Sequence, residues 1–328
     1  MPESNTDDPW CETPDMTPAE VLDALFTPLP AASPEPIDVR GFLAEHGPPP
    51  TGADDGATYF RRLMRVALQA DRRSLASVAG HQAAIRRLFP ETPVDAVVSF
   101  CVSEDKGPRP SHIHTALVEA EDGFTMSGHK RWGSMAPVSD VRYVAASVGH
   151  GDDGRNQLRM VALPADRPGI GVDLEPYRDQ GWGEHQICDL HFDAVPVRAD
   201  EVLPADAYVA YIKPFRLVED VYNTAGTLVG LLQLGRRHEW PDERLERLVG
   251  LIVQAAAIAE TDMASPAAVV LLSDFLREAD AAWSASWSAR EDVPPEVVGA
   301  WSPDRGLLGV AAAARETRRK NAWAALGA

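Results

Sequence analysis

Hydrophobic residues follow a helical period at both ends of the chain and form short runs in the middle. Between residues 58 and 89 they recur three and four positions apart, which predicts two helices. From Pro93 onward, Val, Ile, Phe and Tyr come in short runs separated by Gly, Asp and Pro, which predicts strands. After Pro204 the helical period returns, with one stripe from Phe215 to Leu232 and another from Leu245 to Ala259. This order predicts an α+β fold rather than βαβ alternation.

Seven strands are predicted in the middle of the chain. Connections such as Glu121–Gly123 are short, which favours antiparallel neighbours because parallel neighbours need long crossovers. The expected architecture is therefore a central antiparallel β-barrel or sandwich. The predicted strands are Ala96–Val102, Ile113–Glu119, Phe124–Gly128, Asp140–Ser147, Gln157–Leu163, Gly169–Leu174 and Ile187–Phe192.

The same pattern predicts three domains. Residues 1–92 form an N-terminal helical domain, 93–203 a central β-domain and 204–328 a C-terminal helical domain. Residues 1–56 are rich in Pro, Asp and Ser, so this part is expected to be loosely structured. Four further helical segments are predicted, namely Pro18–Phe26, Ile37–His46, Pro266–Ser284 and Asp304–Leu326.

Composition narrows the class of protein. The chain has 328 residues, 45% of them hydrophobic, so it can bury a sizeable core. Its 31 Lys and Arg against 49 Asp and Glu give a net charge of −18, which disfavours nucleic acid as a partner. No apolar run is long enough to predict a membrane span. Three widely spaced cysteines and an acidic amino terminus without an apolar core favour the cytoplasm.

Two short motifs do not support the chemistry they suggest. Gly149–Gly154 has the GxGxxG spacing of a dinucleotide-binding loop, but Asp152 and Asp153 would repel a pyrophosphate, and a strand follows where a helix is needed. A hairpin loop is the better prediction. His112 and His114 share one face of an extended segment without a third ligand at metal-binding spacing, so no metal site is predicted.

Several spaced motifs carry a resemblance to a known family. Ser99–Glu104 is followed by Gly123–Ser134, which contains a Lys-x-Trp-x-Ser sequence, and then by Asp140–Ala146 and Gly181–Val197. In this order they resemble the acyl-CoA dehydrogenase family, over roughly residues 93–203 and more weakly in the flanking helices. The resemblance implies a β-barrel between helical domains and FAD as the cofactor.

The resemblance also implies a set of flavin-binding residues. Phe100 falls where the family often has Tyr against the flavin, and Val102 and Ser103 fall on the strand that bonds the pyrimidine edge of the isoalloxazine. Trp132 would pack against the ring system, and Ser134 would place its hydroxyl near flavin N5. The alternative for these residue types is structural: a Trp at a strand end commonly packs in a core, and a Ser after Gly commonly forms a turn.

The chain departs from the family pattern in ways that indicate a shortened, divergent member. The segment Asp105–Ser111 replaces the Gly-Ser-Asp loop that cradles flavin phosphate, although Lys106 and Arg109 offer replacement charges for a phosphate. No Gly-Gly pair occurs anywhere in the chain, so the family's Gln-x-x-Gly-Gly turn, supplied by a neighbouring subunit, is missing.

The chemistry of the family needs a carboxylate that removes the α-proton of an acyl thioester. The usual Glu-Gly dipeptide is absent, but the first predicted helix after the β-domain holds Glu219 and Asp220. Matching Ala225 and Gly230 to the family helix favours Asp220, whereas Glu219 lies on the row of Phe215, close to the apolar stripe. At most one of them faces the flavin. A solvent-facing pair at the start of a helix is the alternative.

Two classes of function follow. The first is an FAD-dependent oxidoreductase that carries out α,β-dehydrogenation of an acyl-CoA or related acyl compound, with catalytic Asp220 or Glu219. The second is a degenerate, non-catalytic subunit or binding protein of the same fold that pairs with a complete paralogue. The flavin monooxygenase branch of the fold is a third possibility. The family also leads us to expect a homo-oligomer, or a hetero-oligomer with a paralogue.

Overall fold

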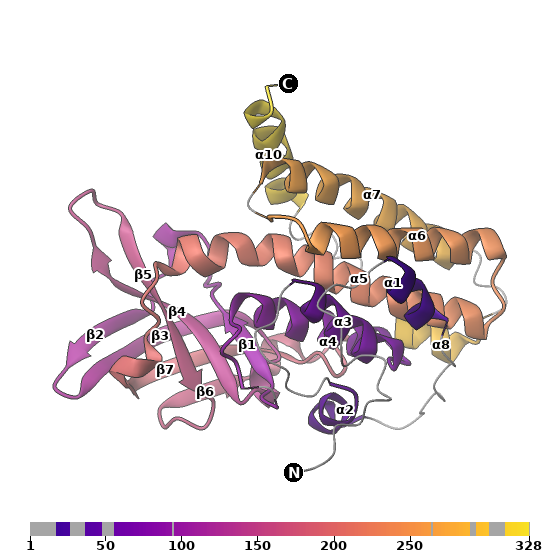
Figure 1. Ribbon diagram of the computed structural model, residues 1–328. Coiled ribbons are helices and arrows are strands. Elements are labelled where there is room, and N and C mark those ends of the chain that lie inside the picture. Colours follow the sequence, from indigo (N-terminus) through magenta and orange to yellow (C-terminus); the bar gives the residue numbers. More distant parts are fainter. Residues whose placement is uncertain are drawn as a thin grey trace, which may run out of the picture.

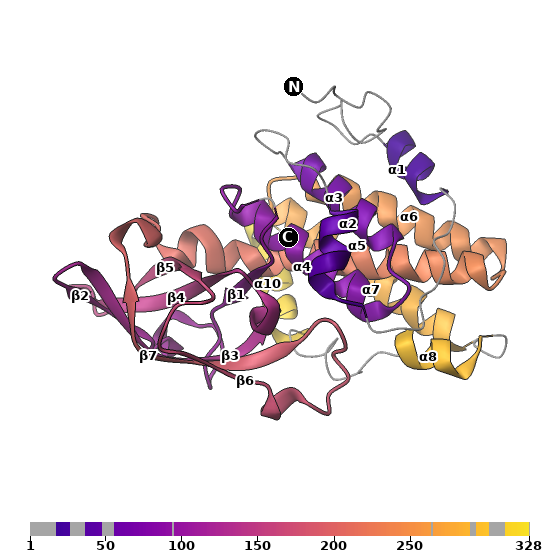
Figure 2. The ribbon, with the colours of Figure 1, turned by 90° about the horizontal axis from the view of Figure 1, so that it is seen from below.

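The computed structural model describes residues 18–26, 37–47, 56–93, 95–263, 265–288, 293–301 and 312–327. A sheet lies at one end of the molecule and helices at the other, and α5 reaches from the helices to the sheet (Figures 1 and 2). The part of the chain that the structure describes contains no helix that is both long and apolar enough to cross a membrane.

Four helices precede the sheet. The two short N-terminal segments predicted from the sequence are helical, and Asp38 caps the second by accepting hydrogen bonds from the amides of Arg40 and Gly41. The rest of the predicted loose region, residues 1–17, 27–36 and 48–55, lies outside the described residues. The helices are α1 (Pro18–Leu25), α2 (Val39–His46), α3 (Gly56–Leu68) and α4 (Arg73–Leu88).

The helices after the sheet pack against α3 and α4 in one apolar core. A π-helical turn, Tyr208–Ile212, leads into the first of them. The predicted helix Asp304–Leu326 is helical from residue 312, and residues 302–311 lie outside the described part of the chain. The helices are α5 (Lys213–Arg237), α6 (Asp242–Ala259), α7 (Pro266–Ser288), α8 (Pro295–Trp301) and α10 (Ala312–Ala325).

Two glycines let α4 and α5 cross at close range. A Cβ on Gly80 would lie 2.5 Å from the Cα of Asn223, and one on Gly226 would lie 2.6 Å from the carbonyl oxygen of Ala76. Real side chains do not tolerate such contacts with backbone atoms. The crossing therefore requires glycine at both positions, and it places the residue after Gly80, His81, against α5.

All seven predicted strands are present, but they form one mixed sheet rather than an antiparallel one. The order is β1-β4-β2-β3-β7-β6, with β5 added beside β4. The expectation of antiparallel neighbours is wrong for β1 and β4, which pair in parallel, and for the single parallel bridge between β2 and β4. In both pairs the two strands are not consecutive in the sequence, because β3 lies between them. The chain between the paired strands is therefore long enough for a parallel crossover. The strands are β1 (Val98–Cys101), β2 (Ala116–Ala120), β3 (Gly123–Ser134), β4 (Val141–His150), β5 (Asn156–Pro164), β6 (Ile170–Asp173) and β7 (Ile187–Val197).

The strand β3 extends six residues beyond the predicted end at Gly128. The added residues include His129, Lys130 and Arg131, whose polar side chains hide the alternation that identifies a strand. Pairing with β7, interrupted by register shifts, holds this extension in the sheet. The extension carries Trp132 and Ser134 to a position beside β1, the strand that contacts α5. This part of the sheet, formed by β1 and the last residues of β3, is called the edge of the sheet.

Aromatic rings join the sheet to the helices. Phe89, which follows α4, stacks on Tyr143 of β4 with ring centres 3.7 Å apart. The rings of Phe100 of β1 and Phe215 of α5 are in contact, with ring centres 4.1 Å apart. These rings fix the start of α5 against β1.

Candidate functional site

The strand β1 and Ser103, two residues after it, lie beside the last residues of β3, running in the opposite direction. The amide of Arg131 donates a hydrogen bond to the carbonyl oxygen of Ser103 at 2.8 Å, and the Ser99 hydroxyl donates to the carbonyl oxygen of Ser134 at 2.7 Å. These two bonds bring together the five residues for which the resemblance implies a flavin-binding role, namely Phe100, Val102, Ser103, Trp132 and Ser134.

The side chains of this set differ in what they contact. Phe100 and Val102 are buried, and the Phe100 ring already has aromatic partners. Ser103 and Ser134 are half-buried, and among the described residues neither hydroxyl has a hydrogen-bond partner. Trp132 is 44% exposed, so it is not the core residue that the structural alternative predicts. The set therefore offers two free hydroxyls and an accessible indole.

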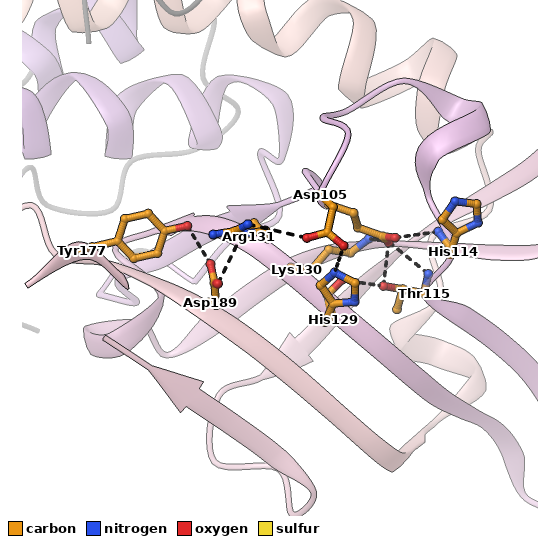
Figure 3. Close-up of polar contacts among 9 residues, drawn as sticks. Asp105, His114, Thr115, His129, Lys130, Arg131, Tyr177 and Asp189 are labelled. Carbon is orange, nitrogen blue, oxygen red and sulfur yellow. Dashed lines mark hydrogen bonds and ion pairs between the residues drawn. The ribbon is translucent and has the colours of Figure 1, made fainter. Parts of the chain in front are cut away.

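Trp132 adopts a left-handed backbone conformation that its neighbours stabilise. Its φ is +60°, which is unusual for a residue with a large side chain. Its amide donates to the Tyr177 hydroxyl at 3.1 Å. That hydroxyl donates to Asp189 at 2.6 Å (Figure 3). The two rings meet edge to face at 4.9 Å. Partial burial and the hydrogen bond to Asp189 raise the pKa of Tyr177 to about 12, so it stays a donor at neutral pH.

A buried ion pair supports the same edge from inside the sheet. Lys130 is fully buried, and its Nζ lies 2.7 Å from Oε1 of Glu104. The carboxylate also accepts hydrogen bonds from Thr115 and from the amide of His114 (Figure 3). Burial lowers the pKa of Lys130 to about 8, although Glu104 opposes the change. Burial favours a higher pKa for Glu104, but Lys130 and the two amides outweigh it and lower the value.

Sequence reasoning assigned no role to Glu104 and Lys130. Both belong to the motifs that carry the resemblance, Glu104 at the end of the first and Lys130 two residues before Trp132. A buried charge is seldom kept without a partner, but Lys130 lies beyond the predicted end of its strand at Gly128, so nothing in the sequence marked it as buried. The partner was not predictable without the register of the sheet.

The segment that replaces the Gly-Ser-Asp loop is exposed and charged. The carboxylate of Asp105 lies 3.2 Å from Nε2 of His129 and 3.6 Å from Nη1 of Arg131 (Figure 3). Lys106 and Arg109 are exposed, and neither forms an ion pair within the described residues. No group of three metal-ligating side chains occurs in the described part of the chain, and Gly149–Gly154 lies in the β4–β5 hairpin, as predicted.

Neither candidate base faces solvent, so the solvent-facing alternative is wrong. Asp220 is 3% exposed at its side chain, and its two oxygens lie 2.6 Å and 3.2 Å from nitrogens of Arg315 on α10. Arg318 is 3.7 Å away. This carboxylate joins α5 to α10, and both oxygens are occupied.

Glu219 has a different environment, although it is the next residue on the helix. Its side chain is 18% exposed, with Oε2 3.0 Å from Arg216 and Oε1 3.4 Å from Nδ1 of His81. Burial favours a raised pKa for Glu219, but His81 and Arg216 lower it, so the carboxylate is ionised at neutral pH. Glu219 follows Phe215 by one helical turn, and Phe215 contacts Phe100.

The donor set fits the ring of a flavin. Flavins are tuned by polar groups at their ring nitrogens, and the hydroxyls of Ser103 and Ser134 have no partner within the described residues. An exposed indole beside them offers a flat surface for a tricyclic ring. The two unpaired cations, Lys106 and Arg109, suit a phosphate.

Comparison with known sequences finds a family model that matches part of the chain. The model of the acyl-CoA dehydrogenase middle domain matches residues 99–195. The acyl-[acyl-carrier-protein] dehydrogenase MbtN of Mycobacterium tuberculosis is 30% identical over 147 residues, and its counterpart in Mycolicibacterium paratuberculosis is 26% identical. Each match covers 44% of this chain and 32% of the relative, so the chain matches about a third of the length of these curated relatives.

Solved structures extend the likeness to the helices. Glutaryl-CoA dehydrogenase from Mycobacterium smegmatis aligns with a TM-score of 0.65 at 14% identity, covering 88% of this chain and 87% of that one. FMN-bound TdsC from Paenibacillus sp. A11-2 gives a TM-score of 0.65 at 15% identity, with 85% of each chain covered. At these identities the likeness concerns the fold. Residues 99–195 thus match the acyl-CoA dehydrogenase middle domain, and the chain has an acyl-CoA dehydrogenase-like fold, which confirms the resemblance seen in the sequence.

Proposed function

We propose that this protein is an FAD-dependent oxidoreductase that dehydrogenates an acyl thioester between its α and β carbons. The observation that carries the proposal is the juxtaposition of Ser103, Trp132 and Ser134 at the edge of the sheet, with two hydroxyls unpaired among the described residues and the indole exposed. The family match covers the residues that form this edge.

Each residue has a separate task in this proposal. Val102 and Ser103 would hold the pyrimidine edge of the isoalloxazine, Trp132 would pack on the ring, and Ser134 would hydrogen-bond near N5. Lys106 and Arg109 would bind the phosphates. FAD, when bound, supplies the acceptor for two electrons. Tyr177 and Lys130 keep the edge in shape, the first through the Trp132 amide and the second through Glu104.

An acyl thioester is the proposed substrate class. The curated relatives are named as dehydrogenases of acyl groups on an acyl carrier protein, and several fold neighbours as acyl-CoA dehydrogenases. We propose that Glu219 rather than Asp220 assists removal of the α-proton. Asp220 is already engaged by two arginines, whereas Glu219 lies one turn from the ring that contacts Phe100.

One spectrum tests cofactor binding. The purified protein, mixed with FAD and desalted, should retain the visible absorbance bands of a flavin. Anaerobic addition of a short-chain acyl-CoA or acyl-carrier-protein thioester should then bleach those bands. Retained bands that no thioester bleaches would contradict the dehydrogenase, and loss of all flavin on desalting would contradict the flavoprotein.

A non-catalytic role is the second candidate, and the environment of Asp220 favours it. The residue that best matches the family's base position serves as a structural tie to α10. A protein without redox chemistry would tolerate that change. Flavin binding without bleaching by any thioester, and without oxygen-dependent turnover, would support this candidate.

A further inference from the structure

Two buried histidines meet Glu219 where the helices contact the sheet. His81 of α4 is 2% exposed, and His185, in the segment before β7, is 5% exposed. Their ring centres are 5.1 Å apart. Nδ1 of His81 lies 3.4 Å from Oε1 of Glu219. Sequence analysis assigned no role to either histidine, although His185 lies within the Gly181–Val197 motif.

Two ring nitrogens of this cluster have no hydrogen-bond partner among the described residues, namely Nε2 of His81 and Nδ1 of His185. Nδ1 of His81 has only the Glu219 carboxylate, at 3.4 Å, which is a long contact. Unpaired polar atoms in a protein interior are costly, so each calls for an explanation. A bound molecule that supplies the missing partners is such an explanation.

The cluster lies beside the edge proposed to bind flavin. The ring of Phe215 stands edge-on to His81 at 6.2 Å and also contacts Phe100 at 4.1 Å. One aromatic ring therefore separates His81 from the edge formed by β1. A substrate between the helices and that edge would be within reach of the imidazole.

A carboxylate beside one nitrogen of an imidazole fixes the role of the other. Glu219 at Nδ1 favours the tautomer with hydrogen on that nitrogen, which leaves the lone pair of Nε2 free to accept a proton. His185 does not compete as a cation, because burial and the neighbouring His81 lower its pKa to about 3.

We propose that His81 is the proton acceptor of this site and that Glu219 is the residue that positions it. The inference rests on the proposed function and names the base of that reaction. It assigns the carboxylate an indirect role: Glu219 orients the imidazole and balances its charge.

The proton transfer is balanced without an oxidant. The C–H bond at the α carbon of the thioester breaks, its electron pair remains on the carbon as an enolate, and the proton forms an N–H bond at Nε2 of His81. The imidazole becomes a cation, and the ionised Glu219 beside Nδ1 stabilises it. Exchange of the α-proton with solvent therefore tests this step separately from oxidation.

The charges that act on this cluster come from several elements. Arg73 of α4 acts on His185, which is on the segment before β7, and Glu219 and Arg216 are on α5. Arg315 of α10 also interacts with Glu219. The protonation states of these groups also affect the exchange rate. The rates of all variants are therefore compared at one neutral pH.

The first measurement needs no flavin, and its main result comes from the unaltered protein. Nitrogen-15 NMR of the protein as purified should show His81 with hydrogen on Nδ1, and Glu219→Gln should mix the two tautomers. A His81 with hydrogen on Nε2 in the unaltered protein would overturn the proposal.

The second measurement follows exchange of the α-protons of a 3-thia-acyl-CoA, which cannot lose a β-hydride, in deuterated buffer with FAD present. His81→Gln should slow the exchange about 100-fold or more, which is the usual contribution of a general base. The control is His238→Gln at the far end of α5, whose Nε2 is likewise buried without a hydrogen-bond partner in the described chain. This variant should exchange at the unaltered rate.

The two measurements distinguish failure of the role proposed for His81 from failure of the proposed function. Full exchange in a folded His81→Gln variant would overturn the role of His81 and leave the flavoprotein standing. Absence of flavin from the spectrum, with the tautomer as expected, would overturn the proposed function and support the Glu219–His81 pair by itself. Unchanged tautomers in Glu219→Gln would remove Glu219 as the positioning residue.

Discussion

The edge of the sheet and the start of α5 both surround buried charge, but they do so differently. At the sheet, Glu104 and Lys130 satisfy each other, and hydrogen bonds from His114 and Thr115, just before β2, satisfy the rest of the carboxylate. At α5, Asp220 is fully paired, whereas Nε2 of His81, the imidazole beside Glu219, has no hydrogen-bond partner in the described chain. A complete network supports structure, and an incomplete one is where a ligand is expected. The difference therefore separates the supporting residues from the candidate reactive ones.

The largest expected effect is at Lys130. Lys130→Met leaves the Glu104 carboxylate buried without its cation, which should lower the free energy of unfolding by about 3–5 kcal/mol. The double variant with Glu104→Gln should recover much of that loss, because both charges are then gone. Urea unfolding measures both. The control is Lys320→Met on α10, where the lysine is exposed, and it should change the free energy of unfolding little. An equal loss in this variant would show that the buried pair has no special role.

Asp220 should come next. Asp220→Asn removes a charge that Arg315 contacts through two nitrogens, and we expect a loss of about 1.5–3 kcal/mol because hydrogen bonds to charged groups are lost. Limited proteolysis should show α10 released first. Glu316→Gln, on the same helix but exposed, is the matched control. If thioesters bleach the flavin of a folded Asp220→Asn variant at the unaltered rate, Asp220 is excluded as the base.

The crossing of α4 and α5 gives a prediction of similar size. Gly80→Ala should destabilise the protein by about 1–3 kcal/mol, because the new Cβ meets the backbone of α5, and should also disturb His81. Gly250→Ala on α6 meets nothing within 4 Å, so it should stabilise by up to about 1 kcal/mol through helix propensity. Thermal unfolding of both variants compares them, and a neutral Gly80→Ala would show that the helices cross less closely.

The two regions also differ in how far the sequence predicted them. The candidate residues Phe100, Trp132 and Ser134 could be named from the sequence because their motifs are local. His81 was not found, since 138 positions separate it from Glu219 and only the glycine crossing joins them. The parallel pairing of β1 with β4 was missed for the same reason: short connections say nothing about strands that are not consecutive.

The smallest effect on stability is expected at Tyr177. Tyr177→Phe removes the hydroxyl that links the Trp132 amide to Asp189, which should cost about 0.5–1.5 kcal/mol. Its effect on FAD affinity should be larger than its effect on unfolding, because the indole is no longer held. Tyr208→Phe, at an exposed tyrosine, is the control for both measurements. Unchanged FAD affinity in Tyr177→Phe would show that Trp132 needs no support.

Equilibrium titration of FAD into the unaltered protein and two tryptophan variants tests the central claim most directly. Trp132 and Trp323 are similarly exposed, at 44% and 41%, but only Trp132 lies at the edge of the sheet. The protein should bind one FAD per chain, Trp132→Ala should weaken binding at least about tenfold, which corresponds to about 1.4 kcal/mol, and Trp323→Ala should leave it unchanged. Absence of FAD binding to the unaltered protein, or equal affinity in Trp132→Ala, would contradict a flavin site at this edge.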